Sequence, residues 1–127
     1  MHIKFVLTYL LFLFSLPPSL SYAQSSSVEY KTFYSEALGQ EKQCAVYLPA
    51  GYEASDEPYP VVYFLHGLFG SERRWAERGA REVVDQLIAD GSVKPMVVAM
   101  PDGDNSFYVN SVHGNAAYED YLLNDFI

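Results

Sequence analysis

The stretch Val61-Val-Tyr-Phe-Leu-His-Gly-Leu-Phe-Gly-Ser71 decides the fold of this chain. Residues 61–65 are apolar without a break, and the run stops at a histidine and a glycine. An apolar run of this length, closed by a glycine-containing turn, is typical of a strand buried on both faces in a parallel sheet. Because glycine has no side chain, the turn can expose backbone N–H groups to an anion or to an oxygen that becomes negative during a reaction.

The residues before this stretch predict a hairpin. Residues 28–34 and 42–48 have the alternating pattern of half-buried strands, and Gly39 between them marks a turn. The single cysteine, Cys44, lies in the second of these strands, so no disulfide can form within the chain. A buried, unreactive thiol is the simplest interpretation of Cys44.

The residues after the stretch predict a strand–helix–strand unit. Apolar residues fall at helical spacing from about residue 79 to residue 90, and Gly91 stands where a helix often ends. The apolar run 96–100 predicts a second buried strand, and two such strands joined by a helix form a right-handed βαβ unit on a parallel sheet. Another amphipathic helix is expected from Tyr118, with Leu122, Leu123 and Phe126 lacking an obvious partner.

Length and charge limit the function classes. The chain has 127 residues, which suffices for one domain with a modest core. Its formal net charge is −8, which argues against a nucleic-acid partner because phosphate binding needs a basic surface.

Residues 1–23 have the pattern of a cleavable signal peptide. Lys4 lies near the start, residues 5–16 are almost wholly apolar, and Ser21-Tyr22-Ala23 has the small residues that signal peptidase recognises. The apolar segment is shorter than the roughly 20 residues that a membrane-spanning helix needs, although an uncleaved anchor is the alternative. The sequence therefore predicts cleavage after Ala23, secretion or release into the periplasm, no stable membrane insertion afterwards, and one domain over residues 24–127.

Three blocks of sequence carry a family resemblance. They are Tyr47-Leu-Pro-Ala-Gly-Tyr52, Tyr59-Pro-Val-Val-Tyr-Phe-Leu-His-Gly-Leu-Phe-Gly-Ser71 and Met100-Pro-Asp-Gly-Asp-Asn-Ser-Phe-Tyr-Val-Asn-Ser111. In this order and spacing they resemble the esterase branch of the α/β-hydrolases that includes esterase D (S-formylglutathione hydrolase), feruloyl and acetyl xylan esterases, tributyrin esterases and the antigen 85 mycolyltransferases. The resemblance implies an α/β fold, the N-terminal portion of an α/β-hydrolase, in which an antiparallel hairpin leads into a parallel βαβ sheet.

The resemblance also implies a role for the loop after residues 61–65. In α/β-hydrolases this loop donates one backbone N–H to the oxyanion hole, and the matching residue here is Leu68, with Gly67 and Phe69 beside the substrate. Removal of one such donor typically costs roughly 3–4 kcal/mol of transition-state stabilisation. From the motif alone, a purely structural strand-to-helix turn is an equally good interpretation.

Further candidates follow the second buried strand. By resemblance, Phe107, Tyr108 and Asn110 border the acyl or alcohol pocket, although simple packing explains the aromatic residues equally well. His66 is expected to hold its turn by hydrogen bonding, because the family's catalytic base lies near the C-terminus, and Asp102 is expected to shape the turn that follows it. The segment 102–105 resembles part of a calcium loop without the remaining ligand spacing, so neither a metal nor another cofactor is predicted.

The motif that a serine esterase needs is missing from the 127 residues. No serine here has glycine two positions before and two positions after it, as the nucleophile elbow requires. The nucleophile, acid and base are therefore expected beyond Ile127, with the fold cut before the elbow and the chain inactive alone.

The resemblance implies acyl-ester hydrolysis through an acyl-enzyme, with a small-molecule or polysaccharide-linked ester as substrate. The alternatives are a non-catalytic remnant or binding protein built on the half-fold, and an acyltransferase of the mycolyltransferase type. Because part of the sheet lacks a covering layer, self-association or aggregation is also expected.

Overall fold

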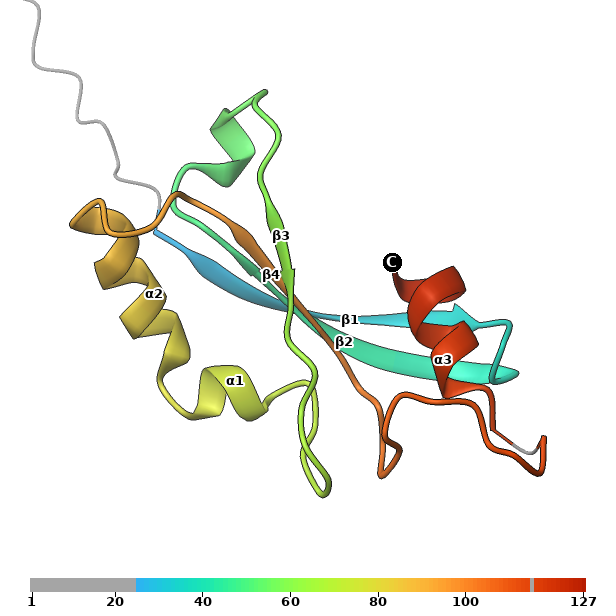
Figure 1. The fold of residues 1–127 in the computed structure, drawn as a ribbon. Helices are drawn as coiled ribbons and strands as arrows, with labels where there is room; N and C mark the ends of the chain where they lie inside the picture. The colour runs from blue at the N-terminus through green and yellow to red at the C-terminus, as the bar shows by residue number, and fades with distance from the viewer. Residues whose placement is uncertain (1–24, 115) are drawn as a thin grey trace, which may run out of the picture.

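The computed structural model describes residues 25–114 and 116–127, which form a sheet with helices on both faces (Figure 1). The predicted signal peptide, residues 1–23, lies outside the described residues. The four strands are β1 (Ser27–Ser35), β2 (Gln40–Leu48), β3 (Val61–Tyr63) and β4 (Val97–Pro101), in the spatial order β1-β2-β4-β3. β1 and β2 form the predicted antiparallel hairpin, β2 and β4 are antiparallel, and β3 and β4 are parallel.

The helices are short. They are the 3₁₀ turn η1 (Tyr52–Ala54), α1 (Arg74–Glu77), α2 (Ala80–Ala89), α3 (Tyr118–Asp120) and the π-helical segment η2 (Tyr121–Phe126). Figure 1 shows α1 and α2 on one side of the sheet and α3 on the other. None of the described helices is long and apolar enough to cross a membrane.

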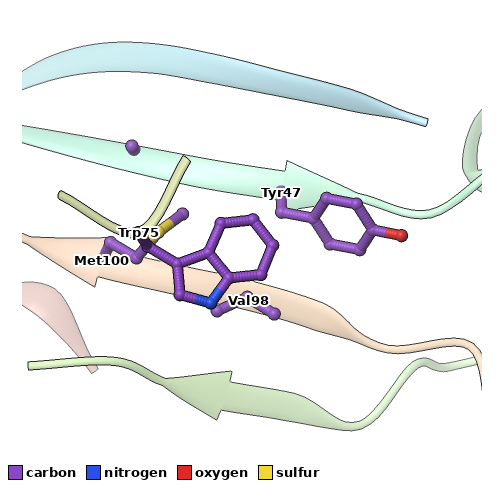
Figure 2. Packing of buried hydrophobic residues seen from close by; sticks show 5 residues of the cluster. Tyr47, Trp75, Val98 and Met100 are labelled. Carbon is purple, nitrogen blue, oxygen red and sulfur yellow. The ribbon is translucent and has the colours of Figure 1, made fainter. Parts of the chain in front are cut away.

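One hydrophobic core lies between the sheet and the α1–α2 layer. It contains Ala45 and Tyr47 of β2, Trp75 of α1, and Val98 and Met100 of β4 (Figure 2). The rings of Tyr47 and Trp75 are 5.5 Å apart, and Trp75 is buried.

A polar network holds α2 against the edge of this core. The Asp85 carboxylate accepts hydrogen bonds from the Tyr47 hydroxyl at 2.6 Å and from the Ser26 hydroxyl at 2.7 Å. Arg81, one turn before Asp85, donates to the Ser26 carbonyl at 2.6 Å. Burial and the hydrogen bond to Asp85 raise the pKa of Tyr47. The helix is therefore held by partly buried hydrogen bonds as well as by apolar contact.

The opposite face of the sheet is covered by the C-terminal helix. Phe33 of β1 stacks on Tyr121 with ring centroids 5.9 Å apart, and Phe126 contacts both Phe33 and Tyr63. The expectation that Phe126 lacks a partner is therefore wrong, whereas Leu123 is indeed exposed.

β3 departs from the prediction, whereas β4 agrees with it. Every residue of β4 is buried, as expected for an inner parallel strand. The strand β3 covers only Val61–Tyr63, and its three residues are 46%, 46% and 39% exposed. The reason is position: within the part of the chain that the structure describes, β3 is the last strand of the sheet and pairs only with β4.

Candidate functional site

The loops that follow β3 and β4 form one unit. Because these strands are parallel, their carboxyl ends lie at the same edge of the sheet, where open α/β folds bind ligands. Two hydrogen bonds join the loops: Gly103 N–H donates to His66 Nε2 at 2.9 Å, and Phe69 N–H donates to Asn105 Oδ1 at 3.2 Å. The structure thus brings the predicted oxyanion loop, residues 66–70, against the loop after β4, which holds the other candidates (Figure 1).

The predicted oxyanion loop contains a tight turn over residues 67–70. Gly70 N–H donates to the Gly67 carbonyl at 2.9 Å, and Phe69, the third residue, has φ of 61°. A positive φ at that position is the mark of a type II turn. Among the residues that the structure describes, the Leu68 N–H has no hydrogen-bond acceptor. Leu68 lines a hollow of about 540 Å³ together with Phe64, Gly67 and Trp75.

Gly70 and Gly67 have different steric surroundings. A Cβ atom at Gly70 would lie 2.9 Å from the Gly67 carbonyl oxygen and 3.0 Å from His66 Nδ1. At Gly67 an added Cβ would meet nothing within 4 Å. Gly70 is therefore required for closure of the turn, whereas Gly67 leaves open space beside Leu68.

His66 connects the two loops, in agreement with the role predicted for it. The residue is 5% exposed. Its Nε2 accepts the hydrogen bond from Gly103 N–H, so the ring proton is on Nδ1, which lies 2.9 Å from the Gly67 carbonyl oxygen and donates to it. Both ring nitrogens are thus engaged by backbone groups.

The structure places Tyr108 in a packed position. Its side chain is 8% exposed, its hydroxyl donates to the Pro101 carbonyl at 3.2 Å, and its ring packs edge-on against His66. Burial raises the pKa of Tyr108 to about 12. The ring also occupies the space above Gly103, where an added Cβ would lie 2.3 Å from it. These contacts describe packing, and contact between Tyr108 and substrate stays a prediction.

Phe107 and Asn110 lie near each other at the surface. Both line an open hollow of about 500 Å³ between the loop after β4 and Tyr118. Phe107 is 77% exposed. The Asn110 side-chain oxygen accepts hydrogen bonds from the N–H groups of Glu119 and Asp120, and so caps the start of the last helix. A substrate-binding role for either residue stays a prediction.

Lys42 was not predicted as part of this region. Its side chain is 4% exposed, and its ammonium lies 2.6 Å from Asp104 Oδ2 and 3.5 Å from Asp102 Oδ2. It also lies over the rings of Tyr118 and Tyr121, 5.7 and 5.8 Å from their centroids. The sequence signal that could have identified Lys42 is its position in the predicted half-buried strand 42–48, where a lysine on the covered side needs a charged partner.

The Lys42 contacts organise the loop after β4. The Asp102 carboxylate also accepts from Asp104 N–H at 3.0 Å, which supports its predicted turn-shaping role. Burial alone would raise the pKa of Asp104, but hydrogen bonds from Lys42 and Tyr118 outweigh it and hold the pKa of that carboxyl below its usual value. Both carboxylates of the segment that resembles part of a calcium loop are therefore paired with a lysine.

Comparison with known proteins points to one group. A family described as Putative esterase matches residues 35–126. The chain is 37% identical over 109 residues to an endo-1,4-beta-xylanase/feruloyl esterase of Xylanibacter ruminicola, and the match covers 80% of this chain and 15% of that protein.

Solved structures support the fold. A ferulic acid esterase matches with a TM-score of 0.74 at 28% identity, over 82% of this chain and 42% of that one. A ferulic acid esterase of Anaeromyces mucronatus, solved in complex with ferulic acid, matches with a TM-score of 0.62 at 24% identity over the same shares. The chain thus spans less than half the length of each of these relatives.

Proposed function

The chain belongs to the Putative esterase family, and on that premise we propose that it contributes half of the oxyanion hole of a serine esterase. The enzyme would hydrolyse carboxylic esters through an acyl-enzyme, with Leu68 N–H as one main-chain donor. Two relatives named for feruloyl or ferulic acid esterase activity favour a hydroxycinnamoyl ester, free or linked to a polysaccharide, as the substrate class.

The observation that supports this proposal best is the geometry around Leu68. Its N–H lacks an acceptor among the described residues, and three hydrogen-bonded groups hold the turn that carries it: Gly70 N–H bonds to the Gly67 carbonyl, the His66 ring bonds to both loops, and Phe69 N–H bonds to Asn105. Attack on an ester carbonyl places negative charge on its oxygen, and a fixed N–H dipole stabilises that charge without reorganising.

The proposed mechanism needs groups that these 127 residues do not contain. No serine among them has the flanking glycines of a nucleophile elbow. We therefore propose that the nucleophile, acid and base belong to a part of the enzyme outside this sequence, and that the chain has no esterase activity alone. The signal-like pattern of residues 1–23 supports export as part of the same proposal, with cleavage after Ala23.

Leu68→Pro tests the donor without removing the turn. Leu68 is the second residue of the turn, the position that proline favours in type II turns, and proline has no N–H. In the full-length esterase that this proposal requires, we expect kcat for methyl ferulate to fall about 10²–10³-fold. Leu68→Ala keeps the N–H and should retain most of kcat. Equal kcat in Leu68→Pro and Leu68→Ala would exclude Leu68 as an oxyanion donor.

The 127-residue chain alone provides a second test. We expect it to hydrolyse 4-nitrophenyl acetate no faster than buffer does, because the nucleophile is absent. Turnover that persists after treatment with a serine-directed inhibitor would contradict the mechanism.

A further inference from the structure

The conformation of Phe69 requires an explanation that the turn itself does not provide. A φ of 61° is disfavoured for a bulky residue that is not glycine, so this backbone conformation is strained. The Phe69 ring is 77% exposed, so burial of the ring does not offset that strain. Contacts to the backbone of Phe69 must hold it in place.

Two side chains from outside the turn make those contacts. The Phe69 N–H donates to Asn105 Oδ1 at 3.2 Å, and the Phe69 carbonyl accepts from Arg74 Nη2 at 3.0 Å. Arg74 begins α1, only five residues along the chain, whereas Asn105 lies in the loop after β4. Only the Asn105 contact therefore ties the peptide between Leu68 and Phe69 to a different part of the fold.

The backbone next to Asn105 is hydrogen-bonded on both sides. It occupies a turn closed by the hydrogen bond from Ser106 N–H to the Gly103 carbonyl at 3.0 Å. The preceding residue, Asp104, is fixed by Lys42. The Asn105 side-chain oxygen is therefore carried by a hydrogen-bonded loop, and its bond to the Phe69 N–H can fix the position of the oxyanion loop.

We propose that Asn105 is a positioning residue, which holds the Leu68–Phe69 peptide in the type II orientation and thereby fixes the turn that carries the Leu68 N–H. A type I turn would relieve the positive φ by rotating this peptide, which would turn the Phe69 N–H away from Asn105. The two arrangements differ in the direction of the Leu68 carbonyl and the Phe69 N–H, so loss of Asn105 leaves the turn that carries the donor with two backbone conformations on its Phe69 side. Oxyanion donors act through fixed placement, and a loosened turn lowers catalysis more than substrate binding. The catalytic consequence rests on the proposed function, whereas the structural anchor does not.

Hydrogen–deuterium exchange at single amides of the 127-residue chain tests the anchor directly. Asn105→Ala removes the acceptor, and we expect the Phe69 amide to exchange about five- to tenfold faster, the factor expected for loss of one hydrogen bond. Asn105→Asp keeps an oxygen at the same place and should restore slow exchange. The Gly103 amide, which is bonded to His66 Nε2, should be unchanged in both variants. Unchanged Phe69 exchange in Asn105→Ala, or equal acceleration at Gly103, would overturn the proposal.

Kinetics of the complete esterase separate this inference from the proposed function. We expect Asn105→Ala to lower kcat for methyl ferulate with little change in KM, and Asn105→Asp to recover most of kcat. If Leu68→Pro abolishes turnover while Asn105→Ala leaves kcat intact, the positioning role is wrong and the oxyanion assignment stands. If the Phe69 amide responds to Asn105→Ala but Leu68→Pro has normal kcat, the anchor stands and the proposed function fails.

Discussion

At the scale of single residues, the oxyanion loop depends on one glycine more than on the other. An added Cβ at Gly70 would lie within 2.9–3.1 Å of the Gly67 carbonyl oxygen and of two His66 atoms. A Cβ added at Gly67 would meet no atom within 4 Å. The two glycines therefore form a matched pair for substitution.

We expect Gly70→Ala to destabilise the chain by about 1–3 kcal/mol, because the atoms it meets belong to the backbone and to a buried ring that cannot move aside. Gly67→Ala should cost no more than about 0.5 kcal/mol, as is usual at an unobstructed surface position. Denaturant midpoints of the two variants provide the measurement. Equal midpoints would mean that the turn does not need the close approach at Gly70.

The Asp104 carboxylate should make the stability of the chain depend on pH. Its pKa is held below the ordinary value of 3.8 by hydrogen bonds from Lys42 and Tyr118 that outweigh the effect of burial. A carboxyl whose pKa is lower in the folded state stabilises the fold above its unfolded pKa, and that contribution is lost as the pH falls through the folded pKa. We therefore expect Asp104→Asn to have a lower melting temperature than wild type at neutral pH. At about pH 3 the difference between the two melting temperatures should be smaller.

Asp56→Asn is the control for that comparison, since Asp56 is an exposed residue of the loop before β3. It should follow the wild-type melting temperature at both pH values. A constant difference between Asp104→Asn and wild type from neutral to acid pH would show that the carboxylate charge does not matter.

At the scale of secondary structure elements, the sequence predicted the type and bounds of helices and strands better than it predicted their burial. The hairpin, α2 and β4 lie close to the predicted ranges, because alternation, helical spacing and an apolar run are local signals. An apolar run also suggested burial for β3, yet β3 is exposed. Burial depends on neighbouring strands and layers, which a run of five residues does not encode.

In the candidate site, too, local sequence features could be predicted and long-range contacts could not. Leu68 and His66 could be placed because one contiguous motif carries them. Lys42 and Asn105 could not, because their contacts join residues that are 62 and 36 positions apart. Pairing of a buried lysine with a distant aspartate, or of an asparagine with a distant backbone N–H, is decided by the fold. These contacts connect the hairpin and the loop after β4 to the oxyanion loop.

At the scale of the whole molecule, the edge of the sheet at β3 is apolar and partly exposed. Val61 and Val62 of β3 are each 46% exposed, and Phe64 and Leu65 beyond the strand are 36% and 42% exposed. Among residues 25–114 and 116–127, β3 pairs on one side only, with β4. An exposed, apolar edge strand is a template for pairing with another chain, and each Å² of apolar surface removed from water contributes about 25 cal/mol. Self-association through β3 is the expected consequence.

Val62→Lys is the test, because a lysine on an edge strand opposes strand pairing through its charge and hydration. We expect sedimentation equilibrium to show wild-type chain associating at micromolar concentration and Val62→Lys shifted towards monomer. Val112→Lys makes the same chemical change at a residue that is 94% exposed but lies in a loop, and it should associate as wild type does. If both lysine variants shift equally, net charge and not the β3 edge controls association. If neither shifts, or if the wild-type chain is monomeric, β3 is not a pairing edge and its apolar side chains remain in water.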